Sequence, residues 1–372
     1  MHILMTVNAA WNIWNFRRSV ADALIADGHK ITILAPPDKS VADLKALGCR
    51  FIPLTMNVKG LNPLSDLMLV LRFQKLFKEE QPDLILSYTI KNNIFGALAA
   101  RRNRIPLVPN VSGLGTAFLS GGIIQQVAEM LYRHAFSPLP QIFFQNDDDQ
   151  SFFVSRKLVQ KHQTQLLPGS GIDLDHFSAT KLPEKSESPV FLLIARLLRD
   201  KGVIEYVEAA RLVKSIYPNA RFQLLGDVGS KNRTAIDADT VKKWQMEGAI
   251  EYLGTTSDVR PFIAASTCVV LPSYREGAPR TLIEAAAMAR PLIATDVPGC
   301  RSVIDDGKTG FLCEVRNAQS LADACQRFLE MSPENRQHMG LAGRTKMERQ
   351  FDQSFVIEAY RKVVRELTVA KE

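Results

Sequence analysis

The sequence alternates short apolar runs with longer amphipathic stretches, and it does so in two successive rounds. The first round predicts strands at 2–7, 30–35, 51–54, 84–87, 107–110 and 141–145. The second round predicts strands at 190–195, 221–226, 250–253, 269–271, 292–294 and 310–312. Alternation of this kind with short connections indicates an α/β fold, in which helices cover both faces of parallel sheets.

A polar, proline-bearing stretch at about 167–187 separates the two rounds and has the composition of an interdomain linker. We therefore expect one domain at 1–167 and a second at 185–350, with a cleft between their sheets. Two domains also fit the length of 372 residues. The final segment, 351–372, is amphipathic and is predicted to return as a helix to the first domain.

The composition indicates the cellular compartment in which the protein is expected. No stretch reaches the roughly 18 uncharged apolar residues of a spanning helix, and the start has no signal-peptide pattern. The five cysteines are odd in number and show no metal-ligand spacing, so we expect buried thiols in a reducing cytoplasm.

The net positive charge is concentrated in the first half of the chain. Residues 1–165 hold 18 Lys and Arg against 12 Asp and Glu, whereas residues 166–372 hold 28 against 27. Such an excess suits nucleic acid or an anionic membrane surface. Since no nucleic-acid-binding signature is present, we expect the membrane surface and no nucleic acid as partner.

Two acids follow the apolar run at 268–271. Glu276 lies in the loop after this strand, and Glu284 lies about one turn into the next helix, which begins near Pro279. The free N–H groups at a helix start bind anions. Phosphate-binding amides flanked by two carboxylates suit a nucleotide sugar, which carries a diphosphate and several hydroxyls; the alternative is two solvated acids.

Two basic residues, Arg196 and Lys201, lie in the turn that follows the strand at 190–195. The carboxyl ends of strands are where open α/β sheets bind ligands. The planar guanidinium group of an arginine and the ammonium group of a lysine both bind phosphate oxygens well. The alternative interpretation is an ordinary basic surface turn.

These segments together resemble the donor half of the retaining glycosyltransferases of family 4, which have the GT-B fold of two Rossmann-like domains facing a central cleft. In the first half, the segments 88–96 and 110–118 are similar to those of bacterial enzymes that transfer N-acetylhexosamines to sugars on undecaprenyl diphosphate. The similarity is strongest to α-1,3-N-acetylgalactosaminyltransferases of glycan and O-antigen assembly.

The resemblance implies a role for each matching residue of the second half. Arg196 and Lys201 would hold the diphosphate of UDP, Glu276 would bind hydroxyls of the donor sugar, and Glu284 would bind the ribose. The other donor-binding residues that it implies are Gly226, Leu253, Gly254, Gly277, Ala278, Pro279, Arg280 and Thr281.

The acceptor side is expected in the first half. Many family members carry two glycines in the first strand-to-helix loop, but here the loop at 8–15 has none, so that phosphate contact cannot be carried over. The residues proposed to contact the polyprenyl-diphosphate-linked acceptor are Asn8, Trp11, Asn15, Lys91, Ser112, Gly113, Gly115 and Thr116. Trp11 could instead pack on the core, and Lys91 could instead be solvated.

The family mechanism implies retention of the anomeric configuration, with the departing phosphate taking the proton of the incoming hydroxyl. The two cations would stabilise the leaving group, so we expect no metal and no cofactor. The aspartate run at 147–149 is interpreted as the start of a helix and not as a metal site.

A membrane-facing surface is expected near the segment 118–124 and the helix that follows it. Its apolar residues would be Val127, Met130, Leu131 and Phe136, and its cations Lys59, Arg72, Lys75, Lys78, Arg101, Arg102 and Arg104. The protein would then lie peripherally on the inner face of the cytoplasmic membrane. Core packing is the alternative, in particular for the stripe at 67–76.

Three other functions remain compatible with the sequence. The first is a GT-B transferase with a different nucleotide-sugar donor or a soluble acceptor. The second is a protein that binds nucleotide sugars without catalysis, and the third is a GT-B UDP-sugar epimerase.

Overall fold

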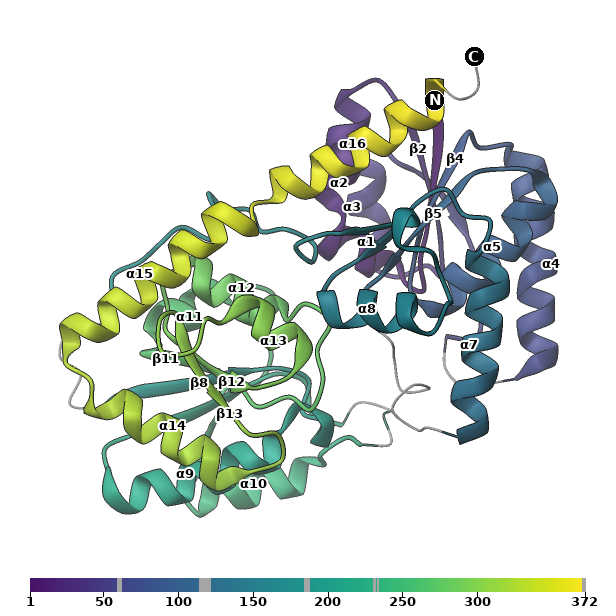
Figure 1. Cartoon of the computed structure of the whole chain (residues 1–372). Helices are drawn as coiled ribbons and strands as arrows, with labels where there is room; N and C mark the ends of the chain where they lie inside the picture. The colour runs from purple at the N-terminus through teal and green to yellow at the C-terminus, as the bar shows by residue number, and fades with distance from the viewer. Residues whose placement is uncertain (59–61, 114–121, 184–187, 230–231, 233, 370–372) are drawn as a thin grey trace. The chain divides into compact units, whose positions relative to one another are not determined.

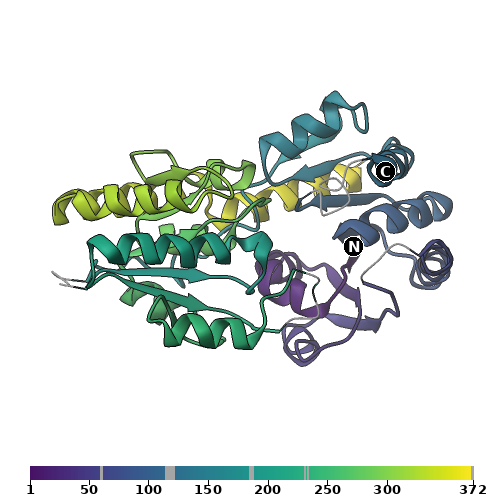
Figure 2. The same cartoon turned by 90° about the horizontal axis from the view of Figure 1, so that it is seen from below.

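The computed structural model describes residues 1–58, 62–113, 122–183, 188–229, 232 and 234–369. The chain forms two compact units. Unit 1 consists of Met1–Gly171 together with Gln353–Glu372, and unit 2 consists of Ile172–Asp352. Each unit contains one parallel sheet with helices on both faces (Figures 1 and 2). The predicted α/β class is therefore confirmed.

Unit 1 has a seven-stranded parallel sheet in the order β3-β2-β1-β4-β5-β6-β7. Its strands are β1 (His2–Thr6), β2 (Lys30–Ala35), β3 (Arg50–Pro53), β4 (Leu84–Tyr88), β5 (Leu107–Val111), β6 (Ile142–Phe144) and β7 (Thr164–Leu166). The order reverses between β1 and β4, and ligands of open α/β sheets bind beyond the carboxyl ends of strands at such a point.

Alternate residues of β1 face opposite helix layers of unit 1, as the strand period requires. Ile3 and Met5 pack with one layer, whereas Leu4 packs with the other. The first layer contains α1 (Ala10–Phe16), α2 (Arg18–Ala26), α3 (Val41–Ala46) and α16 (Gln353–Val369). The second contains α4 (Pro63–Glu80), α5 (Ile90–Asn103), α7 (Gly122–Phe136) and α8 (Asp147–Ser155).

Unit 2 has a six-stranded parallel sheet in the order β10-β9-β8-β11-β12-β13. Its strands are β8 (Val190–Ile194), β9 (Arg221–Leu225), β10 (Glu251–Tyr252), β11 (Cys268–Leu271), β12 (Leu292–Thr295) and β13 (Gly310–Cys313). Here the order reverses between β8 and β11. The two sequence motifs of unit 2 follow these two strands, so the topology brings them to one place.

The helices of unit 2 also form two layers. One face of the sheet is covered by α9 (Val203–Ile216), α10 (Ala238–Met246) and α14 (Ala318–Glu330). The other face is covered by α11 (Arg260–Ala265), α12 (Arg280–Ala287), α13 (Pro298–Val303) and α15 (Pro333–Gln350). All five cysteines are buried free thiols, as the sequence predicted.

The predicted loop at 8–15 is wrong. Residues Ala10–Phe16 form the helix α1, which is followed directly by α2. The buried side chains of Ala10 and Ile13 explain the difference, because their spacing of three places both on the face toward the core. The two tryptophans and three asparagines of this segment hid that short period in the sequence.

The predicted linker at 167–187 is also largely wrong, because most of its described part packs on unit 2. Ile172 and Phe177 are buried in the core of this unit. The guanidinium of Arg290, which is fully buried, donates to the backbone oxygens of Thr180 and Lys181 at 2.8 and 2.9 Å. The chain passes from one unit to the other at Gly171, without a long free connection.

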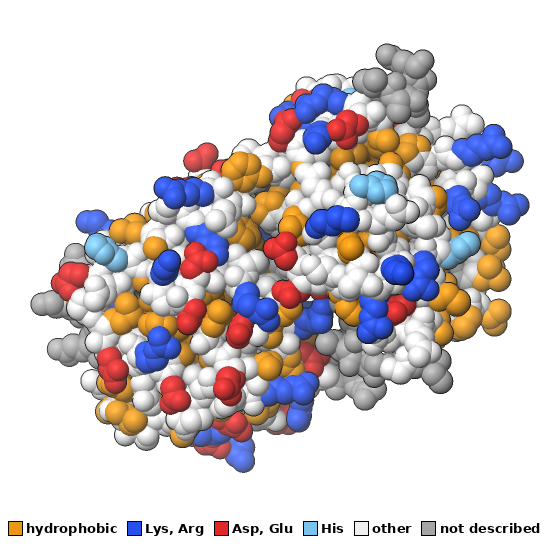
Figure 3. Space-filling view, in the orientation of Figure 1, with side chains coloured by type: hydrophobic (Ala, Val, Ile, Leu, Met, Phe, Trp, Pro, Cys, Tyr) orange, Lys and Arg blue, Asp and Glu red, His pale blue; other side chains and the backbone are white. Residues whose placement is uncertain are grey.

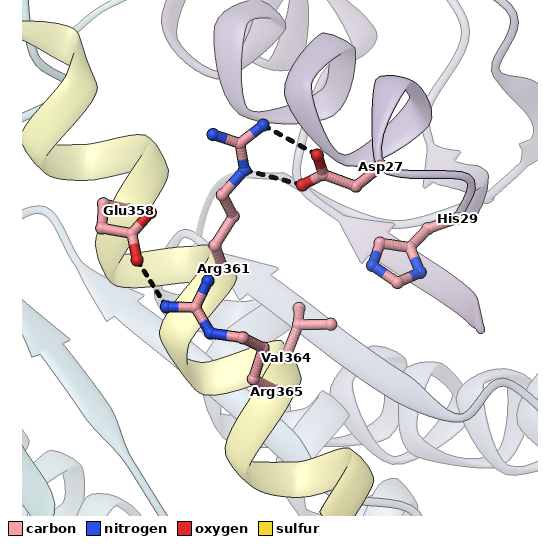
Figure 4. A pocket seen from close by; sticks show the side chains of 6 residues that line it. All are labelled: Asp27, His29, Glu358, Arg361, Val364 and Arg365. Atoms are coloured by element: carbon pink, nitrogen blue, oxygen red, sulfur yellow. Dashed lines mark hydrogen bonds and ion pairs between the residues drawn. The ribbon is translucent and has the colours of Figure 1, made fainter.

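Helix α16 completes unit 1. It packs against α2 (Figure 1), and its side chains Val356, Tyr360 and Val363 are buried in the core beside β1. Figure 4 shows the exposed end of this contact, where Arg361 makes two hydrogen bonds to Asp27, at 2.6 and 2.8 Å. The other charged groups that line this shallow pocket include Arg365 and Glu358, which pair with each other. The pair between Arg361 and Asp27 therefore joins α16 to the end of α2.

Among the described residues, the structure contains no helix that is both long enough and apolar enough to cross a bilayer.

Candidate active site

The turn after β8 is held in place by a glycine. Gly202 has a φ of +70°, and a Cβ at this position would lie 1.9 Å from the carbonyl oxygen of Pro272. Only glycine permits this approach. The turn therefore lies directly against the exit of β11, and its buried anchors Leu197 and Leu198 fix the other end.

This approach brings Lys201 to Glu276. The Nζ atom of Lys201 lies 2.5 Å from Oε1 of Glu276, and the two side chains are only 24% and 13% exposed. They are 75 residues apart in the chain and come from the loops after β8 and β11. The predicted cation and carboxylate thus meet at the carboxyl ends of the two central strands of unit 2.

Arg196 lies in the same turn and is exposed. Within the part of the chain that the structure describes, its guanidinium has no hydrogen-bond or ion-pair partner, whereas its carbonyl accepts from the backbone N–H of Leu198 at 2.8 Å. An exposed guanidinium of this kind can bind an anion without first losing a protein contact.

Glu284 occupies a more enclosed position in α12. Its carboxylate is 12% exposed, and Oε1 accepts a hydrogen bond of 2.6 Å from Nε of Arg280, one turn earlier in the helix. Burial raises the pKa of Glu284 above its ordinary value, while Arg280 opposes this shift and the charge of Asp258 adds to it. The arginine therefore favours the ionised form of this carboxylate.

The other predicted residues around α12 have structural contacts of their own. The hydroxyl of Thr281 donates to the carbonyl of Ile194, at the end of β8, over 3.1 Å. This bond joins the start of α12 to the central strand. Gly277 and Ala278 form the loop before the helix, and Pro279 is its N-cap residue.

Gly299 was missed by the sequence analysis. A Cβ on Gly299 would lie 2.6 Å from the carbonyl oxygen of Gly277 and 2.7 Å from that of Glu276. Its N–H donates to the Glu276 carbonyl over 3.2 Å. Helix α13 thus begins against the loop that carries Glu276, and the Pro-Gly pair at 298–299 was the available signal.

A backbone hydrogen bond joins Gly226 to Gly254. The N–H of Gly226 donates to the carbonyl of Gly254 at 2.8 Å, and the N–H of Leu253 donates to Leu224 at the same distance. A Cβ on Gly226 would lie 1.7 Å from the carbonyl oxygen of Ala195. The protein backbone itself therefore requires glycine at 226, independently of any contact with the donor.

A second group that the sequence analysis missed supports the loop between β11 and Glu276. The hydroxyl of Tyr274 donates to Glu205 in α9 at 2.6 Å, and its N–H donates to the carbonyl of Asp200 at 2.9 Å. The guanidinium of Arg316 lies 4.6 Å from the centre of the Tyr274 ring. Burial raises the pKa of Tyr274, so the phenol stays protonated and keeps its donor.

In unit 1, the residues proposed for the acceptor follow β1, β4 and β5. Asn8 and Asn15 bond within the first turns of unit 1: Asn8 accepts from Asn12 at 3.0 Å, and Asn15 donates to the carbonyl of Trp11 at 2.9 Å. Trp11 is 46% exposed, with its ring edge-on to Phe16. Its indole is therefore accessible, and core packing is not its main role.

Lys91 is not the solvated lysine of the alternative interpretation. Its ammonium lies 2.7 Å from Asp66 at the start of α4, and both side chains are only 13% exposed. A phosphate at Lys91 would therefore have to replace its contact with Asp66, as a diphosphate at Lys201 would replace the contact with Glu276. Ser112 is exposed and Gly113 is half-buried just after β5. Gly115 and Thr116 lie outside the described residues, as does most of the segment 118–124.

The aspartates at 147–149 form the first turn of α8, as predicted. The side chain of Asn146 caps this helix by accepting from the N–H of Asp149 at 2.8 Å.

Comparison with known proteins gives consistent matches over both units. A family model described as glycosyl transferases group 1 matches residues 176–346, and one described as glycosyl transferase 4-like matches residues 2–146. The chain is 28% identical to the N,N'-diacetylbacillosaminyl-diphospho-undecaprenol alpha-1,3-N-acetylgalactosaminyltransferase of Campylobacter jejuni, over 98% of each chain.

Two further similarities extend this result. The UDP-Gal:alpha-D-GlcNAc-diphosphoundecaprenol alpha-1,3-galactosyltransferase of Escherichia coli is 24% identical over 73% of each chain. The crystal structure of HepE from Anabaena in complex with UDP-glucose has a TM-score of 0.79 to this chain at 18% identity. That alignment covers 98% of this chain and 100% of the other.

Proposed function

Because the chain belongs to the GT-B glycosyltransferases, we propose that it transfers an N-acetylhexosamine from a UDP-sugar to a sugar on undecaprenyl diphosphate. N-acetylgalactosamine is the favoured donor sugar. Two relatives with a lipid-diphosphate acceptor in their names, one of them an N-acetylgalactosaminyltransferase, support this substrate class. The product would belong to a bacterial surface glycan or a glycoprotein glycan.

The ion pair between Lys201 and Glu276 is the observation that carries the proposal. It joins an ammonium group, which can bind phosphate, to a carboxylate, which can bind sugar hydroxyls. The two meet where the strand order of unit 2 reverses. A ligand that carries a diphosphate next to a sugar can replace this pairing with one contact to each group. Arg196, exposed in the same turn, adds a second cation for the diphosphate.

Other donor contacts follow from the same arrangement. Glu284, enclosed near the start of α12, would accept hydrogen bonds from the two ribose hydroxyls. The N–H groups of Gly277, Ala278 and Arg280 would face the phosphates and the sugar. The segment 252–255, which is bonded to Gly226 through Gly254, would bind the uracil through its main-chain groups.

In the proposed reaction, the bond between the anomeric carbon and the diphosphate oxygen breaks. A bond from the acceptor hydroxyl oxygen forms on the same face of the sugar. The hydroxyl proton passes to the departing phosphate oxygen, and the configuration is retained. Arg196 and Lys201 would stabilise the negative charge that develops on this oxygen, so we propose that the reaction requires no metal ion.

Unit 1 would bind the acceptor at the carboxyl end of its sheet, where Asn8, Trp11, Ser112 and Gly113 lie. The accessible indole of Trp11 offers an apolar face to a sugar ring. The excess of positive charge in residues 1–165 suits the anionic inner leaflet of the cytoplasmic membrane. We propose a peripheral location on that surface.

The test is transfer of radiolabelled sugar from a panel of UDP-sugars, including UDP-galactose, to undecaprenyl-diphosphate-linked acceptors. Each reaction is run with and without chelator, next to a free-sugar acceptor. We expect transfer from a UDP-N-acetylhexosamine, unchanged by the chelator, and an α-linkage in the product. Transfer only to free sugars would refute the acceptor proposal, and loss of activity with chelator would refute metal independence.

A further inference from the structure

Helix α4 is apolar on two opposite faces. On the inward face, Leu69, Phe73 and Phe77 are buried in the core of unit 1. On the outward face, four large apolar side chains are exposed at spacings of three, four and seven residues: Leu64 by 76%, Leu67 by 57%, Met68 by 49% and Leu71 by 48%. These spacings place the four in a single stripe along the helix.

The outward face changes character along its length. Lys75 and Lys78 follow Leu71 by four and seven residues and so continue the same stripe, and both are exposed. Glu79 is the acid nearest to them in the helix, and it lies 3.8 Å from Lys75. The stripe is therefore apolar in its first half and basic in its second.

Neighbouring helices extend both halves of this surface. At the end of α5, Arg101 and Arg102 are exposed, and Asn103 donates to the carbonyl of Gln74 in α4 over 3.3 Å. In α7, which packs on the same helix α5, Val127 and Met130 are 46% and 59% exposed. Figure 1 shows these three helices on one outer side of unit 1. In Figure 3, hydrophobic side chains line that edge, with Lys and Arg side chains beside them.

The apolar half lies at the ligand-binding end of the unit 1 sheet. The ion pair between Lys91 and Asp66 joins the first turns of α5 and α4, directly beyond the carboxyl end of β4. The stripe from Leu64 to Leu71 therefore begins beside the segments proposed to bind the acceptor.

We propose that the outward face of α4 is the surface by which unit 1 binds an anionic lipid bilayer. The four apolar side chains enter the boundary between headgroups and acyl chains, while Lys75 and Lys78 contact the lipid phosphates. Amphipathic helices with apolar and cationic side chains bind membranes in this way. The inference deepens the proposed function and rests on it, because docking through α4 holds the acceptor site at the surface in which a lipid-linked sugar lies.

The charges disfavour a second copy of the chain as the occupant. A symmetric dimer through this face would bring two copies of Lys75 and Lys78 into one interface. Glu79, the acid beside them, already lies near Lys75. Anionic headgroups complement both lysines.

The experiment is co-sedimentation of the full chain with phosphatidylglycerol/phosphatidylcholine vesicles. The test variant carries Leu67→Gln, Met68→Gln and Leu71→Gln. The matched control carries Leu212→Gln, Ile216→Gln and Met246→Gln, which replace exposed apolar side chains of unit 2. We expect the test variant to bind vesicles at least about tenfold more weakly than wild type, and the control to bind equally. Thermal unfolding followed by circular dichroism should show the same midpoint for all three proteins.

A second variant tests the basic half of the stripe. Lys75→Ala with Lys78→Ala should weaken binding to anionic vesicles severalfold, and added salt should reduce this difference, because the contribution is electrostatic. Binding to pure phosphatidylcholine vesicles should not change. Equal binding of this variant and wild type to anionic vesicles would contradict the assignment of the lysines.

Activity assays separate this inference from the proposed function. The glutamine variant should keep wild-type kcat/KM on a short-chain, water-soluble diphosphate acceptor and lose activity on an acceptor embedded in vesicles. Failure of wild type to transfer sugar to either acceptor refutes the proposed function, whereas vesicle binding is measured without catalysis. Wild-type vesicle binding by the glutamine variant, or a dimer that these substitutions dissociate, would overturn the membrane proposal.

Discussion

Lys201 and Glu276, at the exits of β8 and β11, form a 2.5 Å ion pair inside the candidate donor site. Each group thus satisfies the charge of the other. A bound nucleotide sugar would separate their roles, with phosphate oxygens on the ammonium and sugar hydroxyls on the carboxylate. The pair keeps both side chains in position before the donor arrives, which reduces the ordering that binding requires.

Replacement of Lys201 should affect activity far more than stability. We expect Lys201→Ala to lower turnover by about 100-fold or more, because a charge that stabilises the leaving diphosphate is lost. The free energy of unfolding should fall by only about 1 kcal/mol, since the pair is partly solvated. Lys242→Ala, which removes an exposed lysine of unit 2, is the control. Radiolabel transfer and urea unfolding measure both effects, and an unchanged turnover would contradict the assigned role.

Removal of Arg280 should make UDP binding sensitive to pH. Burial already raises the pKa of Glu284, and Arg280 is the group that opposes this shift. In Arg280→Met the pKa should rise further, so the carboxylate becomes protonated at a higher pH and no longer accepts from both ribose hydroxyls. Affinity should therefore be lost as pH falls, and earlier in the variant than in wild type.

Isothermal titration of UDP between pH 5 and 8 measures this shift. We expect a loss of about tenfold in affinity for Arg280→Met at the acidic end relative to wild type. Arg280→Lys should restore part of the wild-type profile, because it keeps the charge. Parallel profiles for wild type and Arg280→Met would show that Arg280 does not act through Glu284.

The stability of unit 2 should depend strongly on Arg290. Its buried guanidinium donates to oxygens of Ile263, Ala264 and Met288 as well as to those of Thr180 and Lys181. Burial lowers the pKa of this arginine to about 10. Arg290→Met would leave several buried carbonyls without donors and should cost about 3 kcal/mol in urea unfolding. Arg211→Met, at an exposed ion pair, should cost less than about 0.5 kcal/mol.

The free energy of unfolding should depend on pH through His29, which lines the pocket beside α16. Burial lowers the pKa of His29 below its ordinary value of 6.5, so the folded state binds a proton less readily than the unfolded state. The resulting stability is present above the unfolded pKa and is lost as pH falls through 6.5 toward the lower folded value. We expect His29→Gln to reduce the loss of urea stability between pH 7.5 and 5.5, by less than about 1 kcal/mol. Identical losses in both proteins would rule out His29 as a source.

The sequence was sufficient to predict the family, the two parallel sheets and the two motifs of unit 2. Buried parallel strands are continuous apolar runs, and their signal is therefore strong. Helix α1 was missed because only Ala10 and Ile13 are buried in it. Two apolar positions among tryptophans and asparagines are too few to show a helical period. The packing of 172–181 was missed because it depends on residues more than 100 positions away. Ile172 donates to the carbonyl of Phe351, and the guanidinium groups of Arg290 and Arg344 donate to carbonyls of this segment.

The contacts of individual side chains were harder to predict. Nothing local to Lys91 indicates that Asp66 neutralises it, because the pair forms only when α4 and α5 pack side by side. Gly299 was overlooked because its neighbour, the loop at Glu276–Gly277, is close in space and not in sequence.

The return of α16 to unit 1 has a consequence for biosynthesis. Val356, Tyr360 and Val363 fill part of the core of unit 1, whose seven strands all precede unit 2 in the chain. Unit 2, in contrast, has all of its residues once Asp352 has emerged. A chain that lacks residues 353–372 would therefore contain every residue of unit 2 but would leave an open apolar seam in unit 1, to which chaperones can bind.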